Sequence, residues 1–245
     1  MTILVTGGTK GIGLAIADYL ARPGETIVLN YHSDDDAAAA AKARIEARGA
    51  TASLVRADVG SIAGCAQIAE GVAAAHSGTL HIVHSAALIY PTSLLGADLE
   101  KFTAAVHTNG LSLLYLVHKT LPLLARGSSI VFVSSTGARS AISTTYGALG
   151  TGKALAEAII RYLVPELAPK GIRINAVAPG LVHTTSVARM IGSEEAAARF
   201  VERAARANPS GRETRDSDYA SVVKFLISPE AEFVQGQVIA ATGGA

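Results

Sequence analysis

The chain opens with Ile3-Leu4-Val5-Thr6-Gly7-Gly8-Thr9-Lys10-Gly11-Ile12-Gly13, an apolar run followed by a glycine-rich turn that leads into a helical pattern. Glycines at 7, 11 and 13 allow the backbone to approach a diphosphate closely, and the following helix supplies unpaired N–H groups and a partial positive charge. Because the turn lies between a strand and a helix, it predicts a dinucleotide-binding unit. The residues expected to hold the nucleotide here are Gly7, Thr9, Lys10, Gly11, Ile12 and Gly13.

Short apolar runs and long helical patterns alternate along the rest of the chain. The runs are Ile3 to Val5, Thr26 to Leu29, Ser53 to Val55, His81 to Val83, Ile130 to Val133 and Ile172 to Val177. Strands that are apolar throughout are buried on both faces, as in a parallel sheet covered by helices. The helical patterns between them are Ile12 to Ala21, Asp34 to Arg48, Ile62 to His76, Leu99 to Leu124 and Tyr146 to Leu167. The alternation predicts an α/β fold with one doubly wound, Rossmann-type parallel sheet of about seven strands.

Residues 1–245 contain no Pro/Ser-rich linker and no internal repeat, so a single domain is expected. From Leu181 to Asn208 the pattern changes to a polar, helix-prone insertion rich in Ala, Glu and Arg. Such a segment is either a surface elaboration or a lid, and we favour a lid, a substrate loop over about 181–210.

Composition excludes several classes of function. Lysine plus arginine number 21 against 20 acidic residues, a net charge of +1, which gives no electrostatic reason to expect a nucleic-acid partner. Cys65 is the only cysteine, which excludes an intramolecular disulfide and suits a reducing cytoplasm. The histidines show no metal-ligand spacing, so no metal is expected.

The chain is also expected to be cytoplasmic and not to cross a membrane. Its first residues lack the basic region and long apolar run of a signal peptide. The longest apolar stretch, Leu111 to Leu124, is interrupted by His118 and Lys119 and is shorter than the roughly 18 residues that a bilayer span needs.

Ordered landmarks over nearly the whole chain resemble the short-chain dehydrogenase/reductase family. They are Thr6 to Gly13, Asp58-Val59, His84-Ser85-Ala86-Ala87, Asn109, Ser134-Ser135, Tyr146 with Lys153, Asn175 to Gly180, and Gly236-Gln237. The resemblance implies an NAD(P)-dependent oxidoreductase that acts on a small molecule. It also implies a homo-oligomer, a dimer or tetramer; Leu113, Leu114, Leu116 and Val117 could serve that interface or belong to the core.

The same resemblance assigns further cofactor contacts. Asp58 would bond the adenine and Val59 would flank it, and the backbone of Ser85, Ala86 and Ala87 would support the nicotinamide ribose. The nicotinamide carboxamide would be contacted by Pro179, Gly180, Val182 and Thr184. Asp58 could instead cap the helix that follows it, although Ser61 is the better placed cap.

The end of the second strand favours NADP(H) over NAD(H). An NAD-selective protein places an acidic residue there to bind the ribose 2′-hydroxyl, and this chain has Tyr31. Lys10 could offer a cation to a 2′-phosphate, and His32 and Ser33 could donate hydrogen bonds to it. Against this, Asp34, Asp35 and Asp36 follow at once, although they also suit the first turn of a helix.

The catalytic motif departs from the family pattern of Tyr-x-x-x-Lys. Lys153 lies in the expected context, but Leu149 stands four residues before it, and the nearest upstream tyrosine is Tyr146, seven residues before it. Positions i and i+7 still share a helix face, with the phenol shifted by about 4.5 Å along the axis. A loop irregularity at Gly147 or Gly150 could return the phenol to the ordinary position.

The displaced phenol favours reduction of a conjugated C=C bond. Hydride delivery to a ketone leaves charge on the oxygen of the accepting carbon, whereas an enoyl thioester accumulates charge on an oxygen three bonds away. The Tyr-x6-Lys spacing also resembles that of the divergent enoyl-thioester reductases of this family, whose substrates are linked to CoA or a carrier protein. The alternatives are a ketoreductase or alcohol dehydrogenase, acting on a β-keto thioester or a specialised-metabolite ketone, and a catalytically silent dinucleotide-binding sensor.

Three further residues complete the expected site. Ser135, with Ser134 in reserve, resembles the substrate-orienting serine of the family, and Asn109 resembles the asparagine that binds a water in the proton relay to Lys153. An asparagine inside a helix could also be merely exposed to solvent. His84 is expected to be a structural replacement for a family asparagine, packed between strands, rather than a catalytic base.

Overall fold

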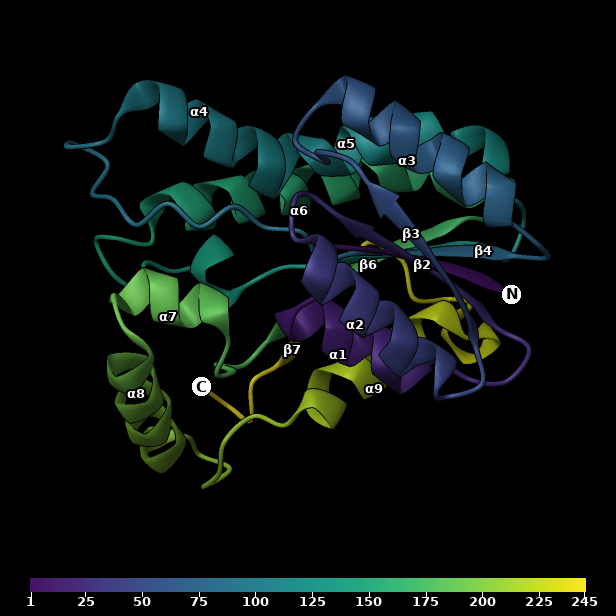
Figure 1. The fold of residues 1–245 in the computed structure, drawn as a ribbon. Helices are drawn as coiled ribbons and strands as arrows, with labels where there is room; N and C mark the ends of the chain where they lie inside the picture. The colour runs from purple at the N-terminus through teal and green to yellow at the C-terminus, as the bar shows by residue number, and fades with distance from the viewer.

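A computed structural model describes residues 1–245 and contains one seven-stranded parallel sheet between two layers of helices (Figure 1). The strands lie in the order β3-β2-β1-β4-β5-β6-β7. Their bounds are β1 Thr2–Thr6, β2 Thr26–Tyr31, β3 Thr51–Arg56, β4 Leu80–His84, β5 Ser129–Val133, β6 Arg173–Pro179 and β7 Val238–Ala241. The predicted doubly wound α/β fold is confirmed.

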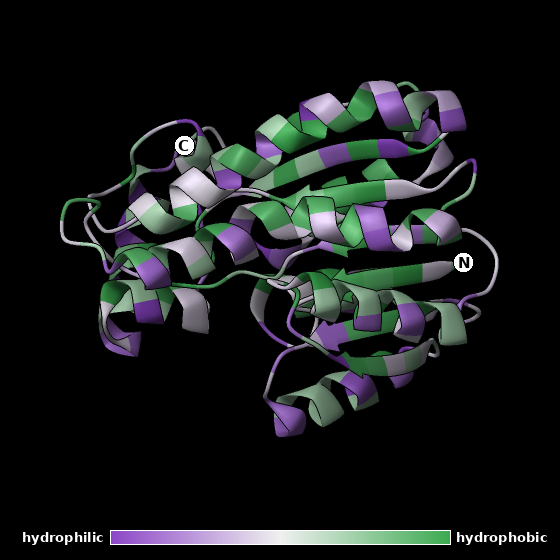
Figure 2. Ribbon diagram, turned by 90° about the horizontal axis from the view of Figure 1, so that it is seen from above, coloured by the Kyte–Doolittle hydropathy of each residue, from purple (hydrophilic) through white to green (hydrophobic).

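Each face of the sheet has its own apolar core. One face is covered by α1 (Gly11–Leu20), α2 (Asp35–Glu46) and α9 (Asp216–Ile227), and the other by α3 (Ile62–Ala75), α5 (Ser112–Thr120) and α6 (Gly147–Leu167). Every residue of β1, β4 and β5 is buried, as the uninterrupted apolar runs predicted. Figure 2 shows largely hydrophobic strands and helices in which hydrophobic and hydrophilic residues alternate.

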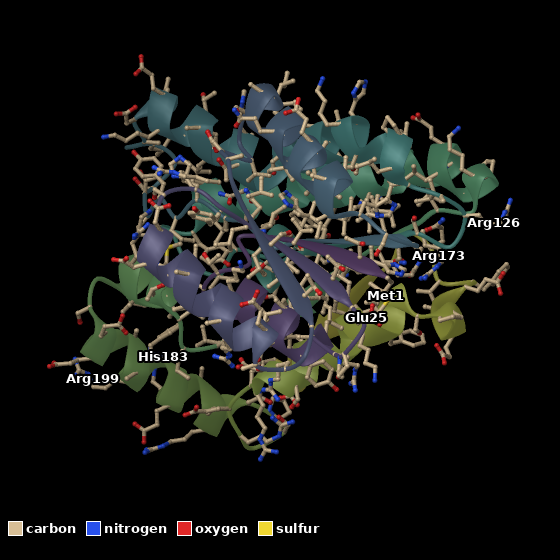
Figure 3. The ribbon with its side chains drawn as sticks, turned by 45° about the vertical axis from the view of Figure 1, so that its right-hand side comes forward. Met1, Glu25, Arg126, Arg173, His183 and Arg199 are labelled. Carbon is tan, nitrogen blue, oxygen red and sulfur yellow. The ribbon has the colours of Figure 1, made fainter.

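The chain reverses its direction of winding at β1. β1 pairs with both β2 and β4, so the crossovers leave it toward opposite edges of the sheet, and ligands of such sheets bind beyond the carboxyl ends of the strands at this point. The segment after β6 forms α7 (Thr185–Ile191) and α8 (Glu194–Ala207). In Figure 3, His183 and Arg199 of this segment lie far from Met1 and Arg173, which stand at the amino ends of β1 and β6.

Some elements differ from the sequence prediction. The expected helix from Leu99 to Leu124 is divided into α4 (Leu99–Val106), a π-helical turn at His107–Leu111, α5 and a short 3-10 turn at Leu121–Leu123. The position of α9 was not predicted, nor was that of the four-residue β7, which is too short to show a periodic pattern.

The apolar residues of helix α5 are divided between the core and the surface. Leu113, Leu116 and Val117 belong to the core, and Leu114 is the exposed member of the group. Association of subunits through this helix stays a prediction. None of the helices combines the length and apolar character needed to cross a membrane.

Candidate functional site

The glycine loop adopts a backbone that only glycine accommodates well. Gly7 and Gly11 have φ values of +60° and +51°, in the left-handed region. A Cβ placed on Gly7 would lie 2.8 Å from the Cα of Ala86, and one on Gly13 would lie 2.3 Å from the carbonyl oxygen of Gly7. The close approaches show that these glycines serve both the turn itself and its contact with the segment after β4.

Helix α1 begins without a side-chain cap. Lys10 occupies the cap position and makes no capping bond, and no acidic residue lies in the first turn. By contrast, Asp34 caps α2 and Ser61 caps α3 through the amide of Gly64. The first amides of α1 therefore remain free for an anion, which fits a diphosphate. Ser61 is the α3 cap, as expected, while the Asp58 carboxylate accepts from the Gly60 amide at 2.9 Å.

His84 joins three elements beneath the glycine loop. Its Nδ1 lies 2.6 Å from the Thr6 hydroxyl and its Nε2 lies 2.7 Å from the Ser112 hydroxyl. The Thr6 oxygen accepts from the amides of Ser85 and Ala86, so its proton is directed to Nδ1 and the ring proton resides on Nε2. Burial, aided by the nearby charge of Lys153, lowers the pKa of His84 to about 3. The ring is neutral and fully bonded, which fits a structural role and not that of a catalytic base.

Two cations, one in the glycine loop and one at the end of β3, are paired with acidic residues at the start of α2. Lys10 forms an ion pair with Asp34. The Arg56 guanidinium donates to Asp35 at 3.2 Å, and the Tyr31 hydroxyl donates to the same carboxylate at 2.8 Å. Because β3 ends beside β2, Arg56 joins the group of Lys10, Tyr31, His32 and Ser33 that the sequence suggested. Sequence reasoning missed Arg56, whose position depends on strand pairing.

Tyr146 is the first residue of a regular helical turn. Its carbonyl accepts from the Gly150 amide at 2.8 Å, so no irregularity at Gly147 or Gly150 moves it toward Lys153. Its hydroxyl lies 2.8 Å from the Ser135 hydroxyl, and a Cβ on Gly137 would lie 2.4 Å from the Tyr146 ring. Burial raises the pKa of Tyr146, and the bond to Ser135 opposes this increase. At neutral pH the phenol therefore retains its proton.

The two serines after β5 point in different directions. Ser135 faces Tyr146, whereas the Ser134 hydroxyl donates to the carboxylate of Glu157 at 2.6 Å. The structure therefore favours Ser135 as the hydroxyl that accompanies the phenol. Glu157 is a buried residue of α6 that the sequence analysis did not identify.

Lys153 is enclosed by the end of β5. Its ammonium donates to the Val133 carbonyl at 2.7 Å and lies 4.4 Å from the centre of the Phe132 ring. Only 4% of the residue is exposed, and burial lowers the pKa of Lys153 to about 7. Tyr146 and Lys153 are thus both bonded to the same strand end, through Ser135 and Val133.

Asn109 lies in the π-helical turn and is fully buried, so the solvent-exposed interpretation is wrong. Its side-chain oxygen accepts from the Leu88 amide, and its side-chain nitrogen donates to the Leu88 carbonyl, both at 2.9 Å. A Cβ on Gly152 would lie 2.6 Å from the Cβ of Asn109, so this turn packs closely on α6. The side chain thus holds the loop after β4 to the π-helical turn that packs on α6.

The segment after β6 reaches back to the glycine loop. Thr184 caps α7 through the Val187 amide, and a Cβ on Gly11 would lie 3.5 Å from the Thr184 methyl group. Gly180 is held by the Ala241 carbonyl at 2.9 Å. Pro179, Val182 and Thr184 therefore belong to a segment that faces the glycine loop, as a nicotinamide site requires.

A cavity of 470 Å³ lies elsewhere and is lined mainly by polar residues of 208–221 and 240–243. Neither Tyr146 nor Lys153 lines it. We therefore place the candidate site on the paired hydroxyls and the lysine, and not in this cavity.

Known proteins resemble this chain over nearly its whole length. Residues 7–245 match the protein family described as "Enoyl-(Acyl carrier protein) reductase". An uncharacterized oxidoreductase of Methylorubrum extorquens is 35% identical over 244 residues, covering 98% of this chain and 96% of the relative. The chain belongs to the short-chain dehydrogenase/reductase family. It is therefore an NAD(P)-dependent oxidoreductase.

Other members of the short-chain dehydrogenase/reductase family differ in the bond that they reduce. The 1-cyclohexenylcarbonyl-CoA reductase of Streptomyces collinus is 30% identical over 241 residues, covering 98% of this chain and 85% of that protein. The solved structure of the angucycline C-6 ketoreductase LanV with bound NADP superposes with a TM-score of 0.85 at 28% identity, covering 99% of this chain and 94% of the other.

Proposed function

We propose that the protein is an NADP(H)-dependent reductase of conjugated enoyl thioesters linked to CoA or a carrier protein. One observation carries the proposal. The phenol of Tyr146 is attached seven residues before Lys153 on an unbroken helical start, about 4.5 Å farther along the axis than in a Tyr-x-x-x-Lys arrangement. An acid in that position suits protonation at an oxygen remote from the carbon that accepts hydride.

The residues have separate tasks in this proposal. When bound, NADPH would supply the hydride that reduces the β-carbon of the substrate. Tyr146 donates a proton to the enolate that results, and Ser135 orients the thioester oxygen beside it. Lys153 holds the ribose, and Asn109 keeps the loop after β4 in place and contributes to the proton relay. The whole chain acts as one unit, in which residues 181–210 close over the substrate.

A second candidate is reduction of a ketone. The Ser135 and Tyr146 hydroxyls lie 2.8 Å apart, so both can donate to one carbonyl oxygen. The similarity to the ketoreductase LanV also supports ketone reduction. A catalytically silent sensor is the least supported alternative, because the chain belongs to an oxidoreductase family. It also has a tyrosine and a lysine, from the start of α6, that are bonded to Ser135 and Val133.

Kinetics with a matched pair of substrates tests the proposal. Crotonyl-CoA and acetoacetyl-CoA have the same chain length and the same carrier, and NADPH is the reductant for both. We expect a higher kcat/KM for the enoyl substrate, with 1-cyclohexenylcarbonyl-CoA as a cyclic comparison. A higher value for acetoacetyl-CoA would instead establish the ketoreductase.

The preference for NADP rests on Lys10 and Arg56. Both cations are exposed and are held by Asp34 and Asp35, so a 2′-phosphate can share them with those carboxylates. We expect Lys10→Ala and Arg56→Ala each to weaken NADPH binding about tenfold, from the lower range of charged hydrogen bonds, with NADH binding unchanged. Fluorescence titration of both nucleotides without substrate measures this. Arg44→Ala, which removes a cation paired with Asp18, is the control; equal losses of NADPH and NADH affinity would contradict the assignment.

A further inference from the structure

Glu157 is a buried carboxylate for which the proposed function has no task. It lies one helical turn after Lys153 on α6 and is 4% exposed. One of its oxygens accepts from the Ser134 hydroxyl at 2.6 Å, and the other accepts from Arg139 Nε at 3.1 Å. A carboxylate in such surroundings is costly unless it is bonded, and both of its oxygens are bonded here.

Its two partners lie at the two ends of one short segment. Ser134 stands between Val133, whose carbonyl accepts from Lys153, and Ser135, whose hydroxyl meets Tyr146. Arg139 follows the 3-10 turn at Thr136–Ala138, which Ser135 caps through the Gly137 amide. Glu157 therefore bonds both ends of the segment from Ser134 to Arg139. This segment places the Ser135 hydroxyl beside the phenol of Tyr146.

Strand pairing restrains only the first residue of the segment from Ser134 to Arg139. The register between β4 and β5 ends at Phe132. On the other side β5 remains paired to β6 as far as Val133, and the Ser134 amide then donates to the Val177 carbonyl at 2.8 Å. The bond from Ser134 to Glu157 thus supplies a restraint from the side of the catalytic helix.

We propose that Glu157 is a positioning residue that, through Ser134 and Arg139, aligns the Val133 carbonyl with Lys153 and the Ser135 hydroxyl with Tyr146. The inference rests on the proposed function, because it assumes that Tyr146 and Lys153 act on substrate and cofactor. Replacement of the whole group of Ser134, Glu157 and Arg139 by well packed apolar side chains would often leave the stability of the fold unchanged or increase it, so stability alone does not explain a buried carboxylate here.

The experiment compares two buried serines of the same strand region. Ser134→Ala removes the hydroxyl that bonds Glu157, and Ser129→Ala removes a hydroxyl that donates to the Leu226 carbonyl at 2.8 Å from the other end of β5. We expect Ser134→Ala to lower kcat about 10- to 100-fold, as a small misplacement does, with NADPH affinity within about threefold. Ser129→Ala should reduce thermal stability alone.

A pH profile supplies a readout that a merely structural bond would not change. If Ser134→Ala lets the Val133 carbonyl tilt, this carbonyl stabilises the Lys153 ammonium less, and the pKa of Lys153 should fall. The limb of the kcat profile that reports the deprotonation of Lys153 should then move to lower pH. His84, the other titratable group whose pKa responds to Lys153, stays neutral and does not obscure this limb. Ser129→Ala should keep the parent profile.

Glu157→Gln keeps an oxygen acceptor for Ser134 and serves as the conservative variant, and as the alternative if Ser134→Ala does not fold. We expect it to retain more activity than Ser134→Ala, and the double variant to be no worse than Ser134→Ala, because the two residues act through one bond. Parent kcat and parent pH profile in Ser134→Ala would overturn the positioning role. Full turnover in Tyr146→Phe would instead show that the proposed function has failed.

Discussion

Replacement of Tyr146 by phenylalanine is expected to lower kcat by about 10²- to 10⁴-fold, the range of a lost general acid. The phenol of Tyr146 retains its proton at neutral pH, because burial raises its pKa, and its oxygen lies 2.8 Å from the Ser135 hydroxyl. Because the ring itself packs against Gly137, phenylalanine should preserve the local structure. Steady-state kinetics with NADPH and the better of the two acyl-CoA substrates measures the loss, and NADPH affinity should remain within about threefold.

Tyr162→Phe is the matched control for this variant. Tyr162 lies on the same helix, α6, and is 79% exposed, so the loss of its hydroxyl should change neither turnover nor stability. Undiminished turnover in Tyr146→Phe would eliminate the proton-donor assignment.

Replacement of Lys153 by methionine is expected to reduce turnover by about 10²- to 10³-fold and also to change how stability depends on pH. Burial lowers the pKa of Lys153 to about 7 in the folded protein, against about 10.4 in an unfolded chain. Between these values the unfolded chain binds the extra proton, so the free energy of unfolding rises with pH. This group raises the free energy of unfolding by about 2 kcal/mol between pH 7 and pH 9. The rise reaches its full size only as the pH approaches the pKa of lysine in the unfolded chain.

Urea unfolding of the cofactor-free protein at pH 7, 8 and 9 measures this second effect. The rise in stability should be present in the parent and absent in Lys153→Met. Lys101→Met, which removes an exposed lysine on α4, should keep the parent rise. The same rise in Lys153→Met would show that the ammonium is not the buried group responsible, and that its pKa is not lowered by its surroundings.

Lys153 illustrates a conflict between stability and the proposed function. The fold encloses an ammonium that burial destabilises, and it compensates in part with the Val133 carbonyl and the Phe132 ring. A cation held in this way is already oriented when the nucleotide binds, so little reorganisation is needed at the site.

The features that could be predicted from the sequence are local ones. Gly7 and Gly11 require a left-handed backbone, the apolar runs are too short and too continuous for anything but buried strands, and the helical patterns between them are long enough to be crossovers. The spacing between Tyr146 and Lys153 is also local, because both lie on one helix. These properties depend on residues close together in the chain, and they were sufficient to predict the fold and the glycine loop.

Which side chains lie in contact depends on how the separate elements pack together. His84 bonds Thr6, 78 positions away, and Arg56 lies beside Tyr31 because β3 pairs with β2. Ser134 and Ser135 are neighbours in sequence, yet one meets Glu157 and the other meets Tyr146. The physical reason is that a hydrogen bond between separate elements depends on strand register and helix rotation, which are set by the packing of the whole core and leave no periodic signal around either partner.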